Sequence, residues 1–537
     1  MSALLPRRGE KGRDPPDQAP LPPILEGGTR TSPGCVYPGS FQTGSGLRVK
    51  RLNTWEPKST AEPWIAVSVQ DLRIYDSSAF TGEPSVCFLK MQAMASERLR
   101  VAVIGAGAAG ICAARHILAR QGTFAPPVVF EAADRVGGTW VYQEAPGVRE
   151  DEFPVCSSMY RGLRTNLPKE IMTFPDHAFA PSLPSFVHHE DVLMYLQSYA
   201  ERFGVLEHVK FRCLVESVRP VPSSAGQEKV AWDVTACCAR NPLERVTERF
   251  HAVMVCSGHY SEPYIPPIPG MEEFEGLLLH SHSYRSPELF SGQTVVLLGA
   301  GPSGTDIALE LSATAEQVIL SHRKPPLDCP LPANLLQAPA VRRLSRRAVT
   351  LEDDSRHRAD AFIFCTGYSY HFPFLGDEAR LRVDEDFVYP LYKHLVHARL
   401  PTLFFVGLCK TLLPFPHFDC QVQFSLAVLE GSCPLPPAAR MEAEVEAEYQ
   451  RHLSAGGQPK YFHRLDALQW SYNRGLAAAG GFPPLPPVVQ KIYEATRVAR
   501  SHDLMGYKEV TVLVLGPEEY RLEKETGGSE GPRPEAS

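Results

Sequence analysis

The chain has few of the features that mark a membrane, secreted or nucleic-acid-binding protein. Its 537 residues contain no run of roughly 18 uncharged apolar residues, the length that a membrane span requires, and the N-terminus has no apolar signal-peptide core. The formal net charge is only −7, without a block of like charge, so we expect no nucleic-acid partner. We expect no transmembrane segment and a cytoplasmic protein, with peripheral association with the endoplasmic reticulum left open.

Closely spaced cysteine pairs are also missing. The 13 cysteines are scattered, and no C-x-x-C motif occurs among them. A flavin disulfide reductase needs a redox-active pair a few residues apart, so this class is disfavoured. Most of the cysteines lie in apolar runs, as Cys256 and Cys365 do, which indicates buried and reduced thiols.

The two ends of the chain differ in composition from its middle. Residues 1–95 are rich in proline, glycine and serine and have few aliphatic runs. Such a segment buries too little apolar surface to offset the entropy of ordering, so we expect it to be disordered, or an extension that a start at Met91 or Met94 would omit. Residues 516–537 form a polar tail.

The middle of the chain predicts an α/β fold. Leu99–Gly105 is an apolar run ended by glycine, followed by an alanine-rich stretch and a second apolar run that ends at Glu131. Thr294–Gly299 begins the same pattern again. We therefore predict two Rossmann-like dinucleotide-binding domains, the smaller inserted into the larger. The expected boundaries are 96–262 for the first part of the larger domain, 263–352 for the inserted domain, and 353–515 for the second part with C-terminal helices.

The first glycine set is Gly105, Gly107 and Gly110, directly after a strand and at the start of a helix. The first glycine makes the tight turn, the second lets backbone N–H groups approach a pyrophosphate, and the third allows close helix packing. Glu131, at the end of the next strand, is placed to accept a hydrogen bond from a ribose 2′-hydroxyl. In this context the pattern predicts a dinucleotide site.

A short loop follows this acid and contains Gly138 and Trp140. Its bare glycine backbone could lie along a large flat cofactor, and we predict that it does because it follows directly after Glu131. The alternative is an ordinary Gly-Gly turn with a buried tryptophan.

The second glycine set is Gly299, Gly301 and Gly304, and its ribose position differs from that of the first. Ser321 and Arg323 stand where a carboxylate would be expected. A cation there suits the 2′-phosphate of NADP, which a carboxylate would repel, with Ser321 as a hydrogen-bonding helper. The alternative is a solvated basic loop. Two sites with different ribose chemistry predict two cofactors and an oxidoreductase.

Between the glycine sets, five residues fill the spacing F-x-G-x-x-x-H-x-x-x-Y/F-K/R: Phe274, Gly276, His280, Tyr284 and Arg285. With this motif and the order of the glycine sets, the chain resembles the flavin-containing monooxygenase family from about residue 99 to about residue 512. The resemblance is to members that lack a hydrophobic C-terminal anchor and oxygenate sulfur, of the N,N-dimethylaniline monooxygenase type.

The resemblance implies FAD at the first glycine set and NADPH at the second. It also implies transfer of oxygen from O2, through a C4a-hydroperoxyflavin, to nitrogen or sulfur of a small amine, thiol or sulfide, as in xenobiotic metabolism. Asn166 would be the catalytic residue beside the flavin, and Gln421 would contact FAD. We expect His280 to orient the domains or act as a hinge. Sulfur is slightly preferred over nitrogen, and a homodimer is left open.

Three rival functions remain. Baeyer-Villiger monooxygenases carry Trp where this chain has Tyr284, which argues against ketone oxidation. An NADPH oxidase and a non-enzymatic flavoprotein sensor are the other two.

His188 and His189, like His280 and His282, lack partner ligands at suitable spacing, so we expect no metal site. We place His188 and His189 at the start of a helix.

Overall fold

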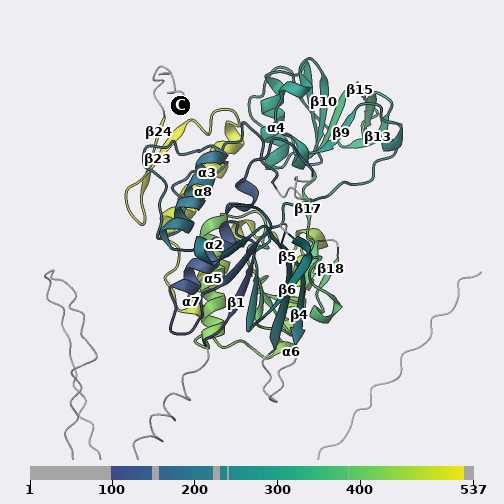
Figure 1. The fold of residues 1–537 in the computed structure, drawn as a ribbon. Coiled ribbons are helices and arrows are strands. Elements are labelled where there is room, and N and C mark those ends of the chain that lie inside the picture. Colours follow the sequence, from purple (N-terminus) through teal and green to yellow (C-terminus); the bar gives the residue numbers. More distant parts are fainter. Residues whose placement is uncertain (1–97, 148–156, 222–229, 239–240, 385, 525–537) are drawn as a thin grey trace, which may run out of the picture. The chain divides into compact units, whose positions relative to one another are not determined.

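The computed structural model describes residues 98–147, 157–221, 230–238, 241–384 and 386–524. The predictions for residues 1–95 and for the last part of the polar tail lie outside these ranges. Both predicted strand-turn-helix units are present, and the first strand of each is an inner strand of its own sheet (Figure 1).

The larger domain contains a seven-stranded sheet with the order β20-β21-β22-β7-β1-β2-β3. Pairings from β22 through β7, β1 and β2 to β3 are parallel, and β20 to β22 form an antiparallel edge. The strands are β1 (Val101–Ile104), β2 (Val128–Glu131), β3 (Val209–Phe211), β7 (Ala252–Val255), β20 (Leu391–Tyr392), β21 (Val396–His397) and β22 (Leu403–Phe405). This sheet draws strands from both sides of the second unit, which confirms the predicted insertion.

The inserted domain has a five-stranded, fully parallel sheet with the order β12-β11-β10-β16-β9. Its strands are β9 (Leu277–His280), β10 (Thr294–Leu298), β11 (Gln317–Ser321), β12 (Leu335–Ala338) and β16 (Ala361–Phe364). Strand β16 lies beyond residue 352, where the sequence placed the end of this domain. We therefore propose a boundary after residue 364.

Seven α-helices, several short 3-10 helices and several small sheets complete the described part. The α-helices are α2 (Ala108–Leu118), α3 (His189–Arg202), α4 (Pro302–Ser312), α5 (Pro414–Glu430), α6 (Ala438–Ser454), α7 (Gln469–Gly480) and α8 (Pro487–His502), and η1 (Gly138–Trp140) is a 3-10 helix. One antiparallel sheet contains β4 (Cys213–Val221), β5 (Ala231–Cys238) and β6 (Asn241–Phe250), and another β13 (Val341–Ser345), β14 (Ala348–Leu351) and β15 (Arg356–Arg358). The remaining pairs are β8 (Glu262–Pro263) with β17 (Tyr368–Ser369), β18 (Arg382–Asp384) with β19 (Phe387–Tyr389), and β23 (Val510–Val514) with β24 (Tyr520–Lys524).

Both faces of β1 are buried, which explains its unbroken apolar sequence. Val101 and Val103 face a core that includes α2 and α5, whereas Ala102 and Ile104 face a second core with β4 and β5. Helix α2 packs against β1 and α5, and α5 packs against α7 (Figure 1). The fold therefore fixes the start of α2 directly beside the end of β1.

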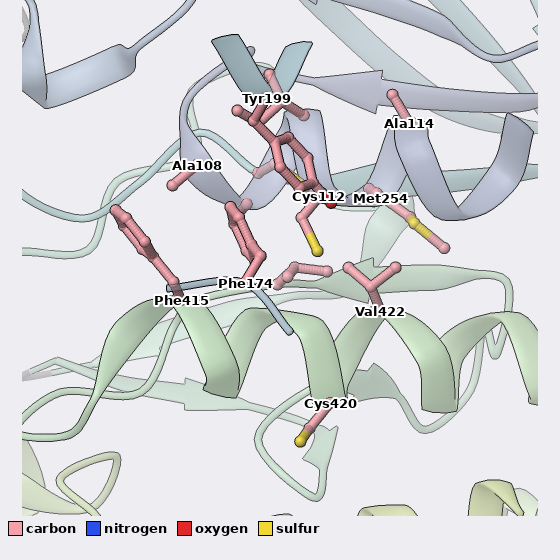
Figure 2. Packing of buried hydrophobic residues seen from close by; sticks show 14 of the residues in the cluster. Ala108, Cys112, Ala114, Phe174, Tyr199, Met254, Phe415, Cys420 and Val422 are labelled. Atoms are coloured by element: carbon pink, nitrogen blue, oxygen red, sulfur yellow. The ribbon is translucent and has the colours of Figure 1, made fainter. Parts of the chain in front are cut away.

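Aromatic side chains fill the space between α2 and α5. Figure 2 shows Tyr199 of α3 above Cys112 of α2, Phe174 beside Cys112, and Phe415 and Val422 projecting from α5. Phe174 and Phe415 stack with ring centroids 5.2 Å apart. Burying each such side chain contributes roughly 1.5–3 kcal/mol, so this layer holds α2 in place.

The long helices leave no candidate for a membrane span. Within the ranges that the structure describes, no helix is both long and apolar enough to cross a bilayer.

His417 makes the stability of the fold sensitive to acid. Its side chain is fully buried in α5, and Nδ1 lies 2.9 Å from Asn473 Oδ1. Burial lowers the pKa of His417 to about 4, against the opposing effect of the Asn473 hydrogen bond. The folded chain therefore holds this imidazole in its neutral form.

We predict that acid removes this stabilisation. An unfolded histidine titrates near pH 6.5, so the contribution is complete above that pH and is lost as the pH falls toward 4. His417 alone then lowers the free energy of unfolding by about 3 kcal/mol across this window, and His417→Gln shows a weaker pH dependence. Thermal unfolding at a series of pH values measures this, with the exposed His502→Gln as control. Equal slopes for the parent and His417→Gln would contradict it.

Candidate functional site

The first glycine turn, Gly105 to Gly110, connects β1 to α2 with little space between them. Gly105 has φ +99°, and a Cβ atom there would lie 2.6 Å from the Cys256 carbonyl oxygen. A Cβ at Gly110 would overlap the Gly105 carbonyl oxygen. Gly107 caps α2, so the partial positive charge of the helix N-terminus faces this turn. The turn therefore fits a pyrophosphate.

Glu131 lies where the sequence placed it, beside the first glycine turn. The side chain is buried, Oε2 accepts from Ala106 N at 2.6 Å, and Oε1 accepts from Ala133 N at 2.7 Å. The arrangement fits a ribose, and this role of Glu131 stays a prediction.

The loop with Gly138 and Trp140 contacts the same turn. Gly138 has φ +57°, and a Cβ there would lie 2.9 Å from the Gly107 Cα atom. Gly137 N donates to Ala106 O at 3.1 Å, which ties the two turns together. Trp140 is half-buried against the main core. Two bare glycine backbones thus lie face to face, an arrangement that fits the predicted FAD.

The second glycine turn, Gly299 to Gly304, repeats the first. Gly299 has φ +112°, and a Cβ there would lie 2.6 Å from the carbonyl oxygen of Cys365, as at the first turn with Cys256. A Cβ at Gly304 would overlap the Gly299 carbonyl oxygen. Gly301 caps α4, and a Cβ added there would meet nothing within 4 Å. The helix N-terminus is therefore open to a phosphate, as NADPH requires.

Two cations contact the second glycine turn and the start of α4: Lys324, which follows Arg323 in the basic run after β11, and Arg500, which the sequence did not indicate. Lys324 Nζ donates to Ala300 O at 2.9 Å, and an Arg500 guanidinium nitrogen donates to Thr305 Oγ1 at 2.9 Å. Partial burial, followed by the charges of Arg464 and Arg500, lowers the pKa of Lys324. A lysine whose pKa is lowered by neighbouring positive charges favours an anionic ligand, because the ligand relieves the repulsion.

The two residues predicted to hold the 2′-phosphate lie in different surroundings. The Arg323 side chain is 80% exposed and pairs with Glu352 at 3.2 Å, a contact of small energy that a phosphate could replace. Ser321 is fully buried, and its hydroxyl donates to Pro339 O at 2.8 Å. A role for Ser321 in phosphate binding would require this hydroxyl to change partner. Both assignments stay predictions.

Gly276 and His280 lie at the two ends of β9. A Cβ at Gly276 would lie 2.5 Å from Asp360 O, so glycine permits a close backbone approach here. His280 Nδ1 accepts from His282 N at 3.0 Å. Burial lowers the pKa of His280 to about 4, opposed by a hydrogen bond with the Gly367 backbone. A neutral, hydrogen-bonded imidazole suits the predicted orienting role better than proton transfer near pH 7. Phe274, the first residue of the motif, packs against the same domain.

Tyr284 and Arg285 bind partners in different domains. Tyr284 donates to Glu310 Oε2 at 2.7 Å on α4 of the inserted domain. Arg285 is buried and donates to Gln143 O at 2.6 Å and Ser157 O at 3.3 Å, both in the larger domain. Where the chain passes between its two domains, one side chain is therefore hydrogen-bonded to each domain.

Tyr160 and Lys508 strengthen this connection and were missed by the sequence analysis. The Tyr160 hydroxyl donates to Asp306 Oδ2, and Lys508 Nζ lies 2.9 Å from Asp306 Oδ1. Asp306 belongs to α4, two residues after the second glycine turn. Both partners are far from Asp306 in the sequence, so no local pattern could have indicated them.

Hydrogen bonds to other segments of the chain position the turn that contains Asn166 and the side chain of Gln421. Asn166 is exposed in a turn whose flanking residues bind a neighbouring segment, through Thr165 N to Val187 O at 2.8 Å and Lys169 N to Ser185 O at 2.7 Å. Gln421 is buried, and its side chain accepts from Gly407 N at 2.8 Å and donates to the Tyr472 hydroxyl at 2.9 Å. These contacts leave the predicted catalytic role of Asn166 and the FAD contact of Gln421 as predictions.

One cluster of metal-ligating side chains occurs within the described ranges, formed by Cys112, His116 and Asp419. His116 Nε2 lies 2.6 Å from Asp419 Oδ1, which leaves no room for an ion between them. An Arg120 guanidinium nitrogen lies 3.4 Å from the other ring nitrogen. We interpret the cluster as a hydrogen-bonded link between α2 and α5. His189 begins α3, as predicted.

Comparison with known proteins gives one family. The chain matches the profile described as FMO-like, Flavin-binding monooxygenase-like, over residues 98–326 and 330–472. Both glycine turns and the connecting motif lie in the matched residues.

Individual relatives agree with this match. Flavin-containing monooxygenase FMO GS-OX-like 2 of Arabidopsis thaliana is 37% identical over 71% of this chain and 85% of its own length. Senecionine N-oxygenase of Tyria jacobaeae is 30% identical over 80% of this chain and 92% of its own. The structure of S-allyl-L-cysteine S-oxygenase from Allium sativum has a TM-score of 0.70 and 33% identity, covering 77% of this chain and 95% of that one. This chain therefore belongs to the flavin-containing monooxygenase family, whose members use FAD and NADPH.

Proposed function

We propose that this monooxygenase oxygenates the sulfur atom of small sulfides or thiols, with amine nitrogen as the second substrate class. The observation that carries this preference is the 33% identity with S-allyl-L-cysteine S-oxygenase over almost the whole of that chain. Senecionine N-oxygenase, at 30% identity, is the specific reason to keep nitrogen as the alternative. A cytoplasmic location and a homodimer stay predictions from the sequence.

The side chains near the two glycine turns have binding and orienting roles in this proposal. The bound flavin, with NADPH and O2, supplies the redox chemistry, so a soft nucleophile needs no acid or base from the protein to activate it. Glu131 would hold the FAD ribose, and Arg323 would hold the NADPH 2′-phosphate. Asn166 would offer a neutral amide that hydrogen-bonds without becoming a proton source.

The segment from His280 to Arg285 would set the distance between the two cofactors. Hydride passes only between rings in contact, so the two dinucleotide domains must be held at a defined separation. Tyr284 binds Glu310 on α4, and Arg285 binds backbone oxygens of Gln143 and Ser157. These contacts connect the helix of the NADPH turn to the FAD domain.

Oxygenation with a matched pair of substrates tests the proposal. We predict that the FAD-loaded chain converts thioanisole to its sulfoxide with one NADPH consumed per product, at a kcat/KM about tenfold or more above that for N,N-dimethylaniline. Product analysis with parallel NADPH and peroxide assays measures this. Stoichiometric hydrogen peroxide without oxygenated product would contradict it in favour of an NADPH oxidase. Faster N-oxide formation would favour the nitrogen class.

Gly301→Ala tests the second glycine turn without disturbing the fold. The new Cβ meets no protein atom within 4 Å, yet it stands at the N-terminus of α4, where the pyrophosphate would approach. We predict an increase of about tenfold or more in the KM for NADPH, with unchanged FAD content and melting temperature. Gly475→Ala in α7, also without a neighbour within 4 Å, is the control. An unchanged KM would place the NADPH pyrophosphate elsewhere.

Arg323→Ala tests recognition of the 2′-phosphate. Only NADPH carries this group, so we predict an increase of about tenfold to a hundredfold in the KM for NADPH and little change for NADH. Arg342→Ala is the control, because Arg342 is likewise an exposed arginine paired with an acid, Asp354. Steady-state kinetics with both nucleotides measures the preference. The assignment is wrong if preference for NADPH survives in Arg323→Ala.

A further inference from the structure

Two cysteines that are distant in sequence meet at the end of one small sheet. Cys213 begins β4 and Cys238 ends β5, and the two residues are directly opposite in the antiparallel register. Their Sγ atoms lie 2.6 Å apart. Sequence spacing does not indicate this pair, because antiparallel strand pairing brings the two thiols together.

The backbone geometry is suited to a disulfide. Directly opposite residues of antiparallel strands have Cα atoms about 4.5–5.5 Å apart, which lies within the range of about 4.4–6.8 Å found for disulfides. A bond between Cys213 and Cys238 therefore requires little or no movement of β4 and β5.

The two thiols differ in access to solvent. Cys213 is buried, at 6% exposure, whereas Cys238 is half-buried. Burial, and then the hydrogen bond with Cys238, raises the pKa of Cys213 to about 12. An oxidant from solvent would therefore react first at Cys238, and Cys213 would be the second, resolving thiol.

The adjacent Cys237 is different. It pairs in register with Leu214, and its side chain interacts with Glu216, which also binds Arg245. Side chains of successive residues in a strand point to opposite faces. Cys237 therefore provides a matched control within the same strand.

We propose that Cys213 and Cys238 form a reversible intramolecular disulfide when the chain meets hydrogen peroxide. The Cys238 sulfur attacks one peroxide oxygen, the O–O bond breaks, and a sulfenic acid and one water result. The Cys213 sulfur then attacks the sulfenic sulfur, the S–O bond breaks, and a second water leaves. Two thiols are oxidised, peroxide is reduced to two waters, and a small dithiol can reverse the bond.

A source of this oxidant lies in the proposed function. NADPH and a proton reduce O2 to hydrogen peroxide when no substrate accepts the oxygen atom. The cross-link would then form in an enzyme that turns over without substrate. This source rests on the proposed function, whereas the disulfide itself is tested with added peroxide.

The cross-link would act close to the predicted FAD ribose site. Arg212, next to Cys213, donates through its backbone N to Ala133 O at 2.9 Å, and Ala133 N donates to Glu131 Oε1 at 2.7 Å. Fixing the start of β4 therefore restrains the turn that holds the Glu131 carboxylate. We infer that the oxidised chain releases FAD more slowly.

Peptide mapping tests the bond. The FAD-loaded chain is treated with hydrogen peroxide, free thiols are alkylated, and trypsin is added without reductant. We expect a linked pair of peptides, 213–229 with 230–240, that disappears after treatment with dithiothreitol. The link should persist in Cys237→Ser and be lost in Cys238→Ser and Cys213→Ser. Its absence from the parent chain, or its persistence in Cys238→Ser, would overturn the proposal.

FAD release tests the consequence. After rapid dilution, flavin fluorescence should appear about threefold or more slowly from the oxidised parent than from the reduced parent. Oxidised Cys238→Ser should release FAD at the rate of the reduced chain, and oxidised Cys237→Ser should behave like the parent. Equal release rates before and after formation of the bond would overturn the inferred effect on FAD. These readouts do not depend on substrate turnover.

Discussion

The close approach of helices α2 and α4 to the strands before them is the constraint on which this structure depends. A Cβ at Gly110 or Gly304 would overlap the carbonyl oxygen of Gly105 or Gly299, and the two turn glycines lie in turn against Cys256 O and Cys365 O. Only glycine lets the helix N-terminus reach this position, where its partial charge faces a phosphate. The same solution occurs twice, once in each sheet, and it gives the chain two helix N-termini that fit the predicted phosphate groups.

The second requirement is that the two sites work together. One peptide segment, Leu277 to Arg285, leaves the sheet of the inserted domain and binds both domains, with Tyr284 on Glu310 and Arg285 on backbone oxygens of residues 143 and 157. Tyr160 and Lys508 add contacts from the larger domain to Asp306. Buried or half-buried polar contacts of this kind fix an orientation, because breaking one leaves its partner without compensation.

Local patterns predicted much of this arrangement. The glycine spacing, the acid at the end of β2 and the basic residues after β11 are features of short segments, so the sequence indicated both turns, Glu131 and the insertion of one domain into the other. The start of α3 at His189 was also predicted correctly. The contacts that depend on tertiary structure were not accessible. Arg500 reaches the second turn from α8, Cys213 meets Cys238 through strand register, and Ser321 faces the interior because the end of β11 is buried.

We propose that the first glycine turn holds FAD and the second holds NADPH, close enough together for hydride transfer. Anaerobic stopped-flow mixing of the FAD-loaded chain with NADPH, followed by the flavin absorbance, tests it directly. We predict complete loss of the oxidised-flavin absorbance in one NADPH-dependent, saturable phase, with one NADPH oxidised per flavin. Retention of the oxidised absorbance in a chain shown to contain bound FAD and to bind NADPH would contradict the claim.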